Sequence, residues 1–255
     1  MFSLFKNWRR RRSLSKPFPE RWLDYLHANI WQYHSLDPAK QERVRQCVQV
    51  MAGEKSWEGI DGFAADDEVK VTIAGTASLL TLGLDQPFYF DRVESILVHP
   101  GLIRNRPIQR GLLVSHEDGY YSGLAWQGGP LIFSWPNVLR GSRRPGDGAN
   151  VVIHEFVHHI DGLDGEMGGT PIIDSPDLQQ RWESVFNRRY QELVNDLDAG
   201  REPRINDYAA TNMAEFFAVA SESFFDSPER LQRNLPDVYE VLSEYFDINP
   251  TEFDR

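Results

Sequence analysis

The sequence predicts an α+β fold, in which a few short strands are followed by a longer run of helices. Segments rich in β-branched and aromatic residues predict strands at about 95–99, 111–115, 120–126 and 130–135. Gly128-Gly129 stands between the last two segments and is typical of a hairpin turn, so we expect a small mixed or antiparallel sheet. Strands followed by helices are typical of an α+β domain with a single core.

Helices are predicted before and after these strands. The first is indicated by an apolar face of Trp22, Leu26, Ile30 and Tyr33, and the second begins at Asp37-Pro38 and stops at Gly53. The one cysteine, Cys47, falls on the apolar stripe of the second helix, so it is expected to pack in the core rather than to react. Later helices are predicted over 150–161, 176–197, 208–225 and 236–246.

The chain is acidic overall, but it begins with a local basic run. The net charge is -11 over 255 residues, which argues against a direct nucleic-acid partner. A basic run from Lys6 to Lys16 is followed by no apolar stretch of the kind that a secretory signal has. We therefore expect a flexible basic tail over residues 1–19, with weak contact to an anionic surface as the alternative.

Residues 20–255 are predicted to form one domain, in which 20–68 is a candidate helical subdomain. No apolar run is long enough for a membrane helix, and a single cysteine is typical of a reducing compartment. We therefore predict a cytoplasmic protein with no membrane partner.

The most informative pattern is His154-Glu155-Phe-Val-His158. On a helix, His154 and His158 project from one face and can bind the same metal ion. Glu155 lies one step round the helix, where a general base for the attacking water belongs. The pattern predicts a zinc metallopeptidase with one Zn²⁺ ion. His159 points elsewhere on the helix and is expected to be structural or to support a ligand.

A catalytic zinc site needs a third protein ligand, and two carboxylates are candidates. Asp164 lies six residues after His158, where some zinc endopeptidases with an extended motif place their last ligand. Those enzymes have a glycine three residues after the second histidine, and this chain has Asp161 there. Glu215 lies in an apolar helical segment, where an isolated carboxylate is costly to bury without a partner. We therefore favour Glu215.

Two further side chains are spaced to fall near Glu215. Tyr208 precedes it by seven residues, and its phenol could donate a hydrogen bond to a developing oxyanion. A packed core tyrosine is the alternative. Glu222 follows Glu215 by seven residues and could orient a ligand histidine through its second nitrogen, with a solvated glutamate as the alternative.

Four segments carry a resemblance to a known family. Residues 150–161 and 207–218 resemble the two signatures of the Mlc titration factor A family, and 127–135 and 221–225 are also similar to it. The resemblance runs from about Trp57 to the C-terminus, and the N-terminal region matches poorly.

This resemblance implies a zincin-like domain of the gluzincin type, with a catalytic core related to anthrax lethal factor, in a cytoplasmic bacterial zinc peptidase. It implies His154, His158 and Glu215 as zinc ligands, Glu155 as the base and Tyr208 as an assisting group. Family members are also described as binding the glucose repressor Mlc, drawing it off DNA and so modulating the sugar phosphotransferase system. An Mlc-like transcriptional repressor is the implied partner.

The sequence therefore predicts hydrolysis of peptide bonds in a peptide or protein substrate. Aminopeptidase-like action and cleavage within a chain are both open at this stage. The rival hypothesis is a binding protein that mainly sequesters a transcription regulator, since an acidic surface suits a basic DNA-binding partner. A purely structural metal site is disfavoured, because such sites usually have four protein ligands.

Overall fold

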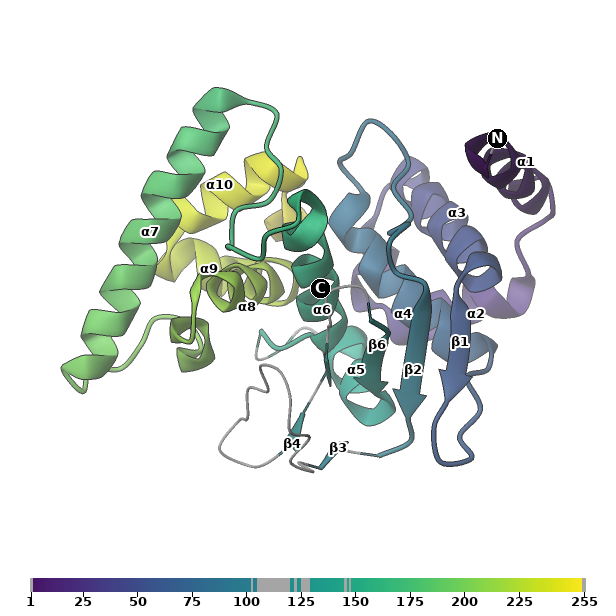
Figure 1. Ribbon diagram of the computed structural model, residues 1–255, viewed down its shortest axis with the longest axis horizontal. Coiled ribbons are helices and arrows are strands. Elements are labelled where there is room, and N and C mark those ends of the chain that lie inside the picture. Colours follow the sequence, from purple (N-terminus) through teal and green to yellow (C-terminus); the bar gives the residue numbers. More distant parts are fainter. Residues whose placement is uncertain are drawn as a thin grey trace.

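The computed structural model describes residues 2–101, 103–104, 120–121, 123–124, 129–144, 146 and 148–253. Figure 1 shows two groups of elements on either side of a central helix, α6 (Val151–Asp161). The sheet and the helices of the first half of the chain lie on one side, and α7 to α10 lie on the other. This arrangement confirms the predicted α+β fold with N-terminal helices.

The main sheet is small and mixed, in the order β1-β2-β6-β5. Its strands are β1 (Ser56–Gly59), β2 (Ser95–His99), β5 (Gly123–Leu124) and β6 (Leu131–Ser134). Strands β1, β2 and β6 are parallel to one another, and β5 is antiparallel to β6. A separate pair joins β3 (Ile103–Arg104) to β4 (Tyr120–Tyr121).

Strand β2 has the predicted bounds, and the β5–β6 pairing agrees with the predicted hairpin. Gly128 of its turn and the predicted strand at 111–115 lie outside the described residues. Strand β1 was not predicted, because its four residues, Ser-Trp-Glu-Gly, show little β-branched character.

The N-terminal helices begin at clear sequence signals. Asp37 accepts hydrogen bonds from the backbone of Ala39 and Lys40, and Asp66 accepts one from Val69. The helical elements here are α1 (Phe2–Leu14), α2 (Glu20–Asn29), η1 (Trp31–Ser35), α3 (Pro38–Glu54), α4 (Asp67–Ser78) and η2 (Leu79–Thr81). Helix α4 is buried along nearly its whole length, and Cys47 packs inside α3 as expected.

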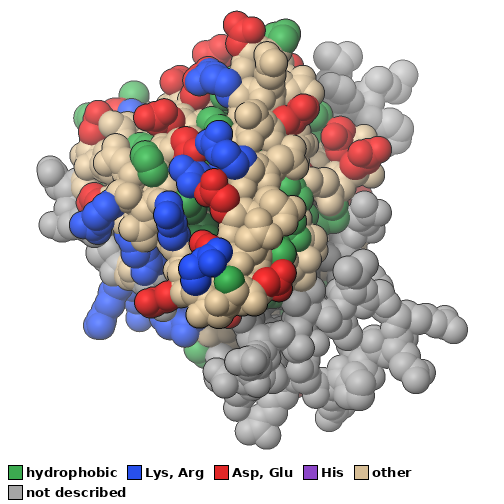
Figure 2. Space-filling view, turned by 90° about the vertical axis from the view of Figure 1, so that its left-hand side faces the viewer, with side chains coloured by type: hydrophobic (Ala, Val, Ile, Leu, Met, Phe, Trp, Pro, Cys, Tyr) green, Lys and Arg blue, Asp and Glu red, His purple; other side chains and the backbone are tan. Residues whose placement is uncertain are grey.

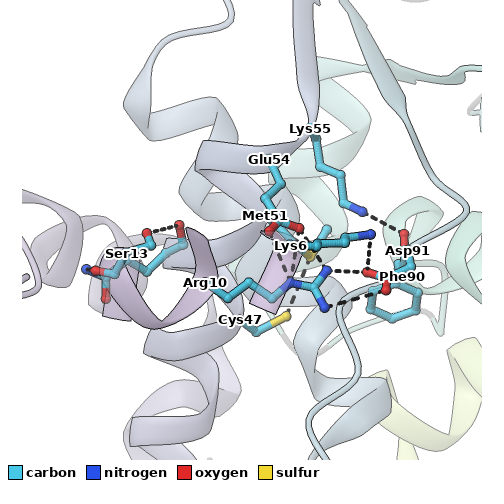
Figure 3. Close-up of polar contacts among 10 residues, drawn as sticks. Lys6, Arg10, Ser13, Cys47, Met51, Glu54, Lys55, Phe90 and Asp91 are labelled. Atoms are coloured by element: carbon cyan, nitrogen blue, oxygen red, sulfur yellow. Dashed lines mark hydrogen bonds and ion pairs between the residues drawn. The ribbon is translucent and has the colours of Figure 1, made fainter. Parts of the chain in front are cut away.

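The structure describes helix α1 where the sequence suggested a flexible tail. Arg10 donates to Glu54 of α3 at 2.8 Å and also pairs with Asp91, and Lys6 lies 3.1 Å from Asp91 (Figure 3). These acidic partners are 44 and 81 residues from Arg10 along the chain. Ion pairs over such separations leave no local pattern in a sequence. The division into a tail, one domain and a subdomain stays a prediction.

The helices predicted over 150–161, 176–197 and 236–246 are confirmed to within one residue, whereas two short helices, Trp135–Arg143 and Pro228–Asn234, were not predicted. The helical elements of the second half are α5 (Trp135–Arg143), α7 (Pro176–Asp198), η4 (Asp207–Ala210), α8 (Met213–Asp226), α9 (Pro228–Asn234) and α10 (Pro236–Phe246), with short turns η3 (Gly162–Asp164) and η5 (Pro250–Glu252). The prediction of one continuous helix over 208–225 was wrong. Asn212 is extended there and caps α8, because its side chain accepts a hydrogen bond from the Glu215 backbone N–H at 3.0 Å.

Aromatic side chains fix α6 and α8 in the core. Phe156 of α6 lies 4.6 Å from Phe90, ring centre to ring centre. Phe217 of α8 lies 4.9 Å from Trp182 of α7, which stacks on Phe186. All five rings are buried, so α6 and α8 are held between the sheet and α7. Within the described part of the chain, no helix is both long enough and apolar enough to cross a membrane.

Candidate metal centre

Helix α6 begins at a capping residue that fixes the position of its first turn. The side chain of Asn150 accepts hydrogen bonds from the backbone of Val152 and Ile153, both at 3.2 Å. The apolar residues of the helix are buried on both sides of the His154–His158 pattern. His154 and His158 lie one turn apart and reach toward α8.

Three ligand-type atoms converge between α6 and α8. The Nε2 atoms of His154 and His158 are 3.1 Å apart, and Oε2 of Glu215 lies 3.1 Å and 3.3 Å from them. Among the described residues, these three side chains form the group that could hold a metal ion. The structure thus brings together the two histidines of one helix and the preferred carboxylate of another.

The geometry and chemistry of this group fit a bound cation. Nδ1 of His154 lies 2.7 Å from the carboxylate of Glu222, which holds the proton on that nitrogen and leaves Nε2 with its lone pair. Oε2 of Glu215 is buried, and among the described residues it faces no hydrogen-bond donor beyond the Nε2 atoms of His154 and His158. Ligands at about 2.1 Å around a tetrahedral ion are roughly 3.4 Å apart, close to the separations found here.

The electrostatics of the group show an excess of buried negative charge. Burial opposes protonation of His154, but the charges of Glu222 and Glu215 outweigh it and raise the pKa of His154 well above its usual value. Burial likewise acts to raise the pKa of Glu215, but His154 and His158 lower it far below its usual range. A divalent cation at the same place would balance these carboxylates.

Glu155 lies beside the group without belonging to it. Its side chain is buried, and its Oε2 atom has no hydrogen-bond partner in the described part of the chain. Burial raises the pKa of Glu155, partly offset by the neighbouring His154 and His158. A buried carboxylate with a raised pKa and a free oxygen can accept and return a proton near neutral pH.

Tyr208 reaches the site from the turn η4, on the other side of the break at Asn212. Its ring centre lies 6.0 Å from that of His154. Burial, followed by the negative charges of Glu215 and Glu155, raises the pKa of Tyr208, so the phenol keeps its proton and can donate it in a hydrogen bond. Tyr208 and Glu215 therefore lie on two separate elements, η4 and α8, and not on successive turns of one helix.

Glu222 supports the site through two contacts. Besides holding His154, its carboxylate accepts a hydrogen bond from the backbone N–H of Asn150, the cap of α6. Glu222 therefore joins the start of α6 to the middle of α8. The sequence indicated the histidine contact but missed Asn150, although an Asn directly before an apolar helix is a cap signal.

Two other residues singled out in the sequence lie outside the group. Asp164 is exposed and accepts a hydrogen bond from the backbone of Glu166 at 2.9 Å, within a turn. His159 faces Phe90 at 5.9 Å between ring centres, and burial, with the charges of Lys55 and Arg92, lowers its pKa to about 4.

Asp161, which the sequence did not mark as functional, holds the segment after α6 against α8. Its buried carboxylate accepts a hydrogen bond from the Gly169 backbone at 2.9 Å, and Trp182 donates to the Gly169 carbonyl at 3.0 Å. Gly169 has a φ of +77°, and a Cβ there would lie 2.4 Å from the carbonyl oxygen of Met213. Met213 is two residues before Glu215, so these contacts border the metal centre.

A buried group of two helical histidines and a glutamate on an α+β core defines the class of protein as a zincin-like metallopeptidase, a hydrolase. The chain belongs to the family described as glucose-regulated metallo-peptidase M90, which matches residues 5–247. The match includes most of α1, so family similarity begins well before Trp57, where the sequence resemblance was placed.

Relatives from several bacteria are similar over most of their length. A protein of Synechocystis sp. named Uncharacterized protein slr2042 is 34% identical over 247 residues, covering 96% of this chain and 90% of the relative. Mlc titration factor A of Escherichia fergusonii is 26% identical, covering 90% and 86%. The protein of that name from Serratia proteamaculans is 29% identical, covering 84% and 82%. These similarities confirm the resemblance to the Mlc titration factor A family.

Proposed function

We propose that this protein hydrolyses peptide bonds in peptides or proteins, with one zinc ion held by His154, His158 and Glu215. The observation that carries the proposal is the convergence of three ligand atoms within 3.3 Å of one another, beside the free buried oxygen of Glu155. Two histidines and a carboxylate are a ligand set typical of catalytic zinc, since they leave a position open.

Each side chain has a separate role in the proposed reaction. When bound, zinc would polarise the scissile carbonyl and lower the pKa of water. Glu155 takes a proton from the attacking water and later passes it to the leaving amine. Tyr208 donates a hydrogen bond to the tetrahedral oxyanion, and Glu222 keeps His154 in the tautomer that presents its Nε2 lone pair.

Glu155→Gln tests this proposal when combined with metal analysis. The variant should keep its metal and lose hydrolysis by roughly 10²–10⁴-fold, because glutamine cannot accept the proton. Asp164→Asn is the matched control, since it removes a carboxylate from the exposed turn after α6 and should leave turnover unchanged. Unchanged turnover in Glu155→Gln would refute the proposed mechanism.

The same assay addresses aminopeptidase-like action. An aminoacyl anilide with a free amine reports removal of a terminal residue, and a peptide blocked at its N-terminus reports cleavage within the chain. Faster turnover of the anilide supports the aminopeptidase-like mode, and turnover of the blocked peptide alone rules it out.

A second candidate function is sequestration of an Mlc-like transcriptional repressor in the cytoplasm, with no direct contact to nucleic acid. It is favoured by the relatives named Mlc titration factor A and by the net charge of -11, which suits a basic DNA-binding surface. A pull-down with purified repressor tests it. Capture by Glu155→Gln as strong as by the wild type would make binding separate from peptidase activity, and no capture by either would refute it.

A further inference from the structure

Helix α1 has an inner face that is anchored and an outer face that is not. On the inner face, Lys6 and Arg10 pair with Glu54 and Asp91, and Ser13 lies against α3 (Figure 3). On the outer face, Phe5 is 63% exposed and Trp8 is 52% exposed. Among the described residues, these are the two phenylalanine or tryptophan side chains that are exposed.

The outer face is also basic. Arg9, Arg11 and Arg12 are exposed, and among the described residues none of the three has an acidic partner within ion-pair distance. Arg12 lies over the ring of Trp8 at 5.6 Å, and Trp8 stacks on Phe5 at 5.9 Å. The outer face of α1 thus combines two exposed rings with three exposed arginines, in a chain whose net charge is -11.

The α7 face, at the opposite end of the molecule from α1, shows a different arrangement of arginines. In Figure 2, which looks onto the side of α7, basic side chains lie among acidic ones. Arg181 pairs with Glu244, and Arg188 pairs with Asp237. Arg181 and Arg188 thus have acidic partners, whereas the arginines on the outer side of α1 have none among the residues that the structure describes.

We propose that the outer face of α1, formed by Phe5, Trp8, Arg9, Arg11 and Arg12, docks on an anionic phospholipid surface. Such a surface offers both parts of what this face needs, an apolar layer for the rings and phosphate groups for the guanidinium groups. The proposal takes up the alternative that the basic run contacts an anionic surface. It reverses the expectation of no membrane partner, which rested on the lack of an apolar run long enough for a membrane helix.

A lipid surface fits this face better than a nucleic acid does. Bases stack on open ring faces, and here the rings of Phe5 and Trp8 are stacked on each other with Arg12 over Trp8. Insertion between lipid headgroups requires only that the rings are apolar and protrude, and it does not require a ring face that is free for stacking. The acidic remainder of the chain would also repel a long polyanion that extends beyond α1.

Docking through α1 leaves the metal centre open. Helices α1 and α7 lie at opposite ends of the molecule, and α6 lies between them (Figure 1). The inner ion pairs of Lys6 and Arg10 hold the helix to the body, so the lipid-bound helix carries the rest of the chain with it. The proposal is independent of the peptidase activity, because no residue of the metal centre takes part in it.

Co-sedimentation of the purified full chain with vesicles tests the proposal. The protein should bind vesicles of phosphatidylcholine mixed with phosphatidylglycerol, should not bind phosphatidylcholine alone, and should be released by salt. Arg11→Ala with Arg12→Ala should weaken binding by roughly fivefold per arginine, and Phe5→Ala with Trp8→Ala should weaken it by at least as much.

A charge-matched control separates the face from the net charge. Arg181→Ala with Arg188→Ala removes the same charge from the α7 side, where both arginines are about half exposed at 51%, and should leave vesicle binding unchanged. All variants should keep the wild-type Tm, because the changed side chains are exposed.

Three results overturn the proposal: no binding to anionic vesicles, equal binding to neutral vesicles, or equal loss of binding in the control variant. Binding to a single-stranded oligonucleotide without binding to vesicles would overturn it in favour of a nucleic acid.

Discussion

The metal centre and the outer face of α1 are both regions where the charges of the chain do not balance. At the metal centre, Glu155, Glu215 and Glu222 bring three carboxylates into a buried space with two histidines. On the outer face of α1, Arg9, Arg11 and Arg12 are exposed and have no acidic partner in the described part of the chain. One imbalance is negative and buried, and the other is positive and solvated.

The difference lies in what each imbalance costs the folded state. Desolvated carboxylates are expensive unless a cation or proton donor compensates them, so the buried group restricts what can bind there. Solvated arginines cost little, because water and salt screen them. A buried imbalance therefore specifies a ligand closely, whereas an exposed one indicates only the charge and polarity of a partner. Three measurements test this contrast.

Removal of the metal should have the largest effect on stability. An ion present at a thousand times its Kd stabilises the folded state by about 4 kcal/mol, and its loss leaves the buried carboxylates uncompensated. A strong chelator should therefore lower the Tm, and added zinc should restore it. The variant Arg11→Ala with Arg12→Ala should respond to the chelator like the wild type, whereas His158→Ala should not respond. A wild-type Tm that is unaffected by chelation would contradict the contrast.

Lys55 provides a buried cation for comparison, between the ion pairs of α1 and the core. Its ammonium group donates to the Phe90 carbonyl at 2.6 Å (Figure 3), and burial lowers its pKa to about 8 from 10.5. Between these two pH values the unfolded chain binds more protons than the folded one, so stability rises with pH. Below about pH 8, Lys55 is charged in both states, and the full cost of burying its charge destabilises the folded chain.

The free energy of unfolding of the wild type should rise by up to about 3 kcal/mol between these two pH values. Lys55→Met should not show this rise, because methionine does not titrate. Urea unfolding at about pH 8 and at about pH 10.5, the two ends of this range, measures the difference between variant and wild type. Arg11→Ala, which removes an exposed cation of α1, should follow the wild-type pH profile. Parallel profiles for Lys55→Met and wild type would show that burial of Lys55 has no such cost.

The smallest of the three effects is expected for Glu222→Gln. A glutamine amide can donate to Nδ1 of His154, which would shift the proton to Nε2 and remove a ligand lone pair. Zinc affinity, measured by competition with a chromophoric chelator, should fall roughly 10–100-fold. Glu244→Gln, on the exposed side of α10, should leave the affinity unchanged. An unchanged affinity in Glu222→Gln would mean that this contact does not orient His154.

The parts of the site that the sequence predicted depend on local spacing. His154 and His158 share a face because a helix repeats every 3.6 residues, and Glu215 stood out as a charge within an apolar segment. The structure brings all three together, and it places Glu222 at the nitrogen that the spacing indicated.

The parts that the sequence missed depend on contacts between distant segments. Arg10 meets Asp91 across 81 residues, and Asn150 meets Glu222 across 72. Neither pair has a periodicity or a motif, so only the folded chain can show it. The break at Asn212 was missed for a different reason, since the apolar spacing continues across it and hides the cap.

Because Cys47 is buried, its reactivity reports local unfolding of the N-terminal helices. It is the one cysteine in the sequence, it lies near Arg10 beneath α1, and its burial raises the pKa of the thiol to about 12. An alkylating reagent can therefore reach a reactive thiolate only when α1 and α3 separate from the core. The rate of labelling reports how often that separation occurs, and a lipid surface that holds α1 would change that rate without any mutation.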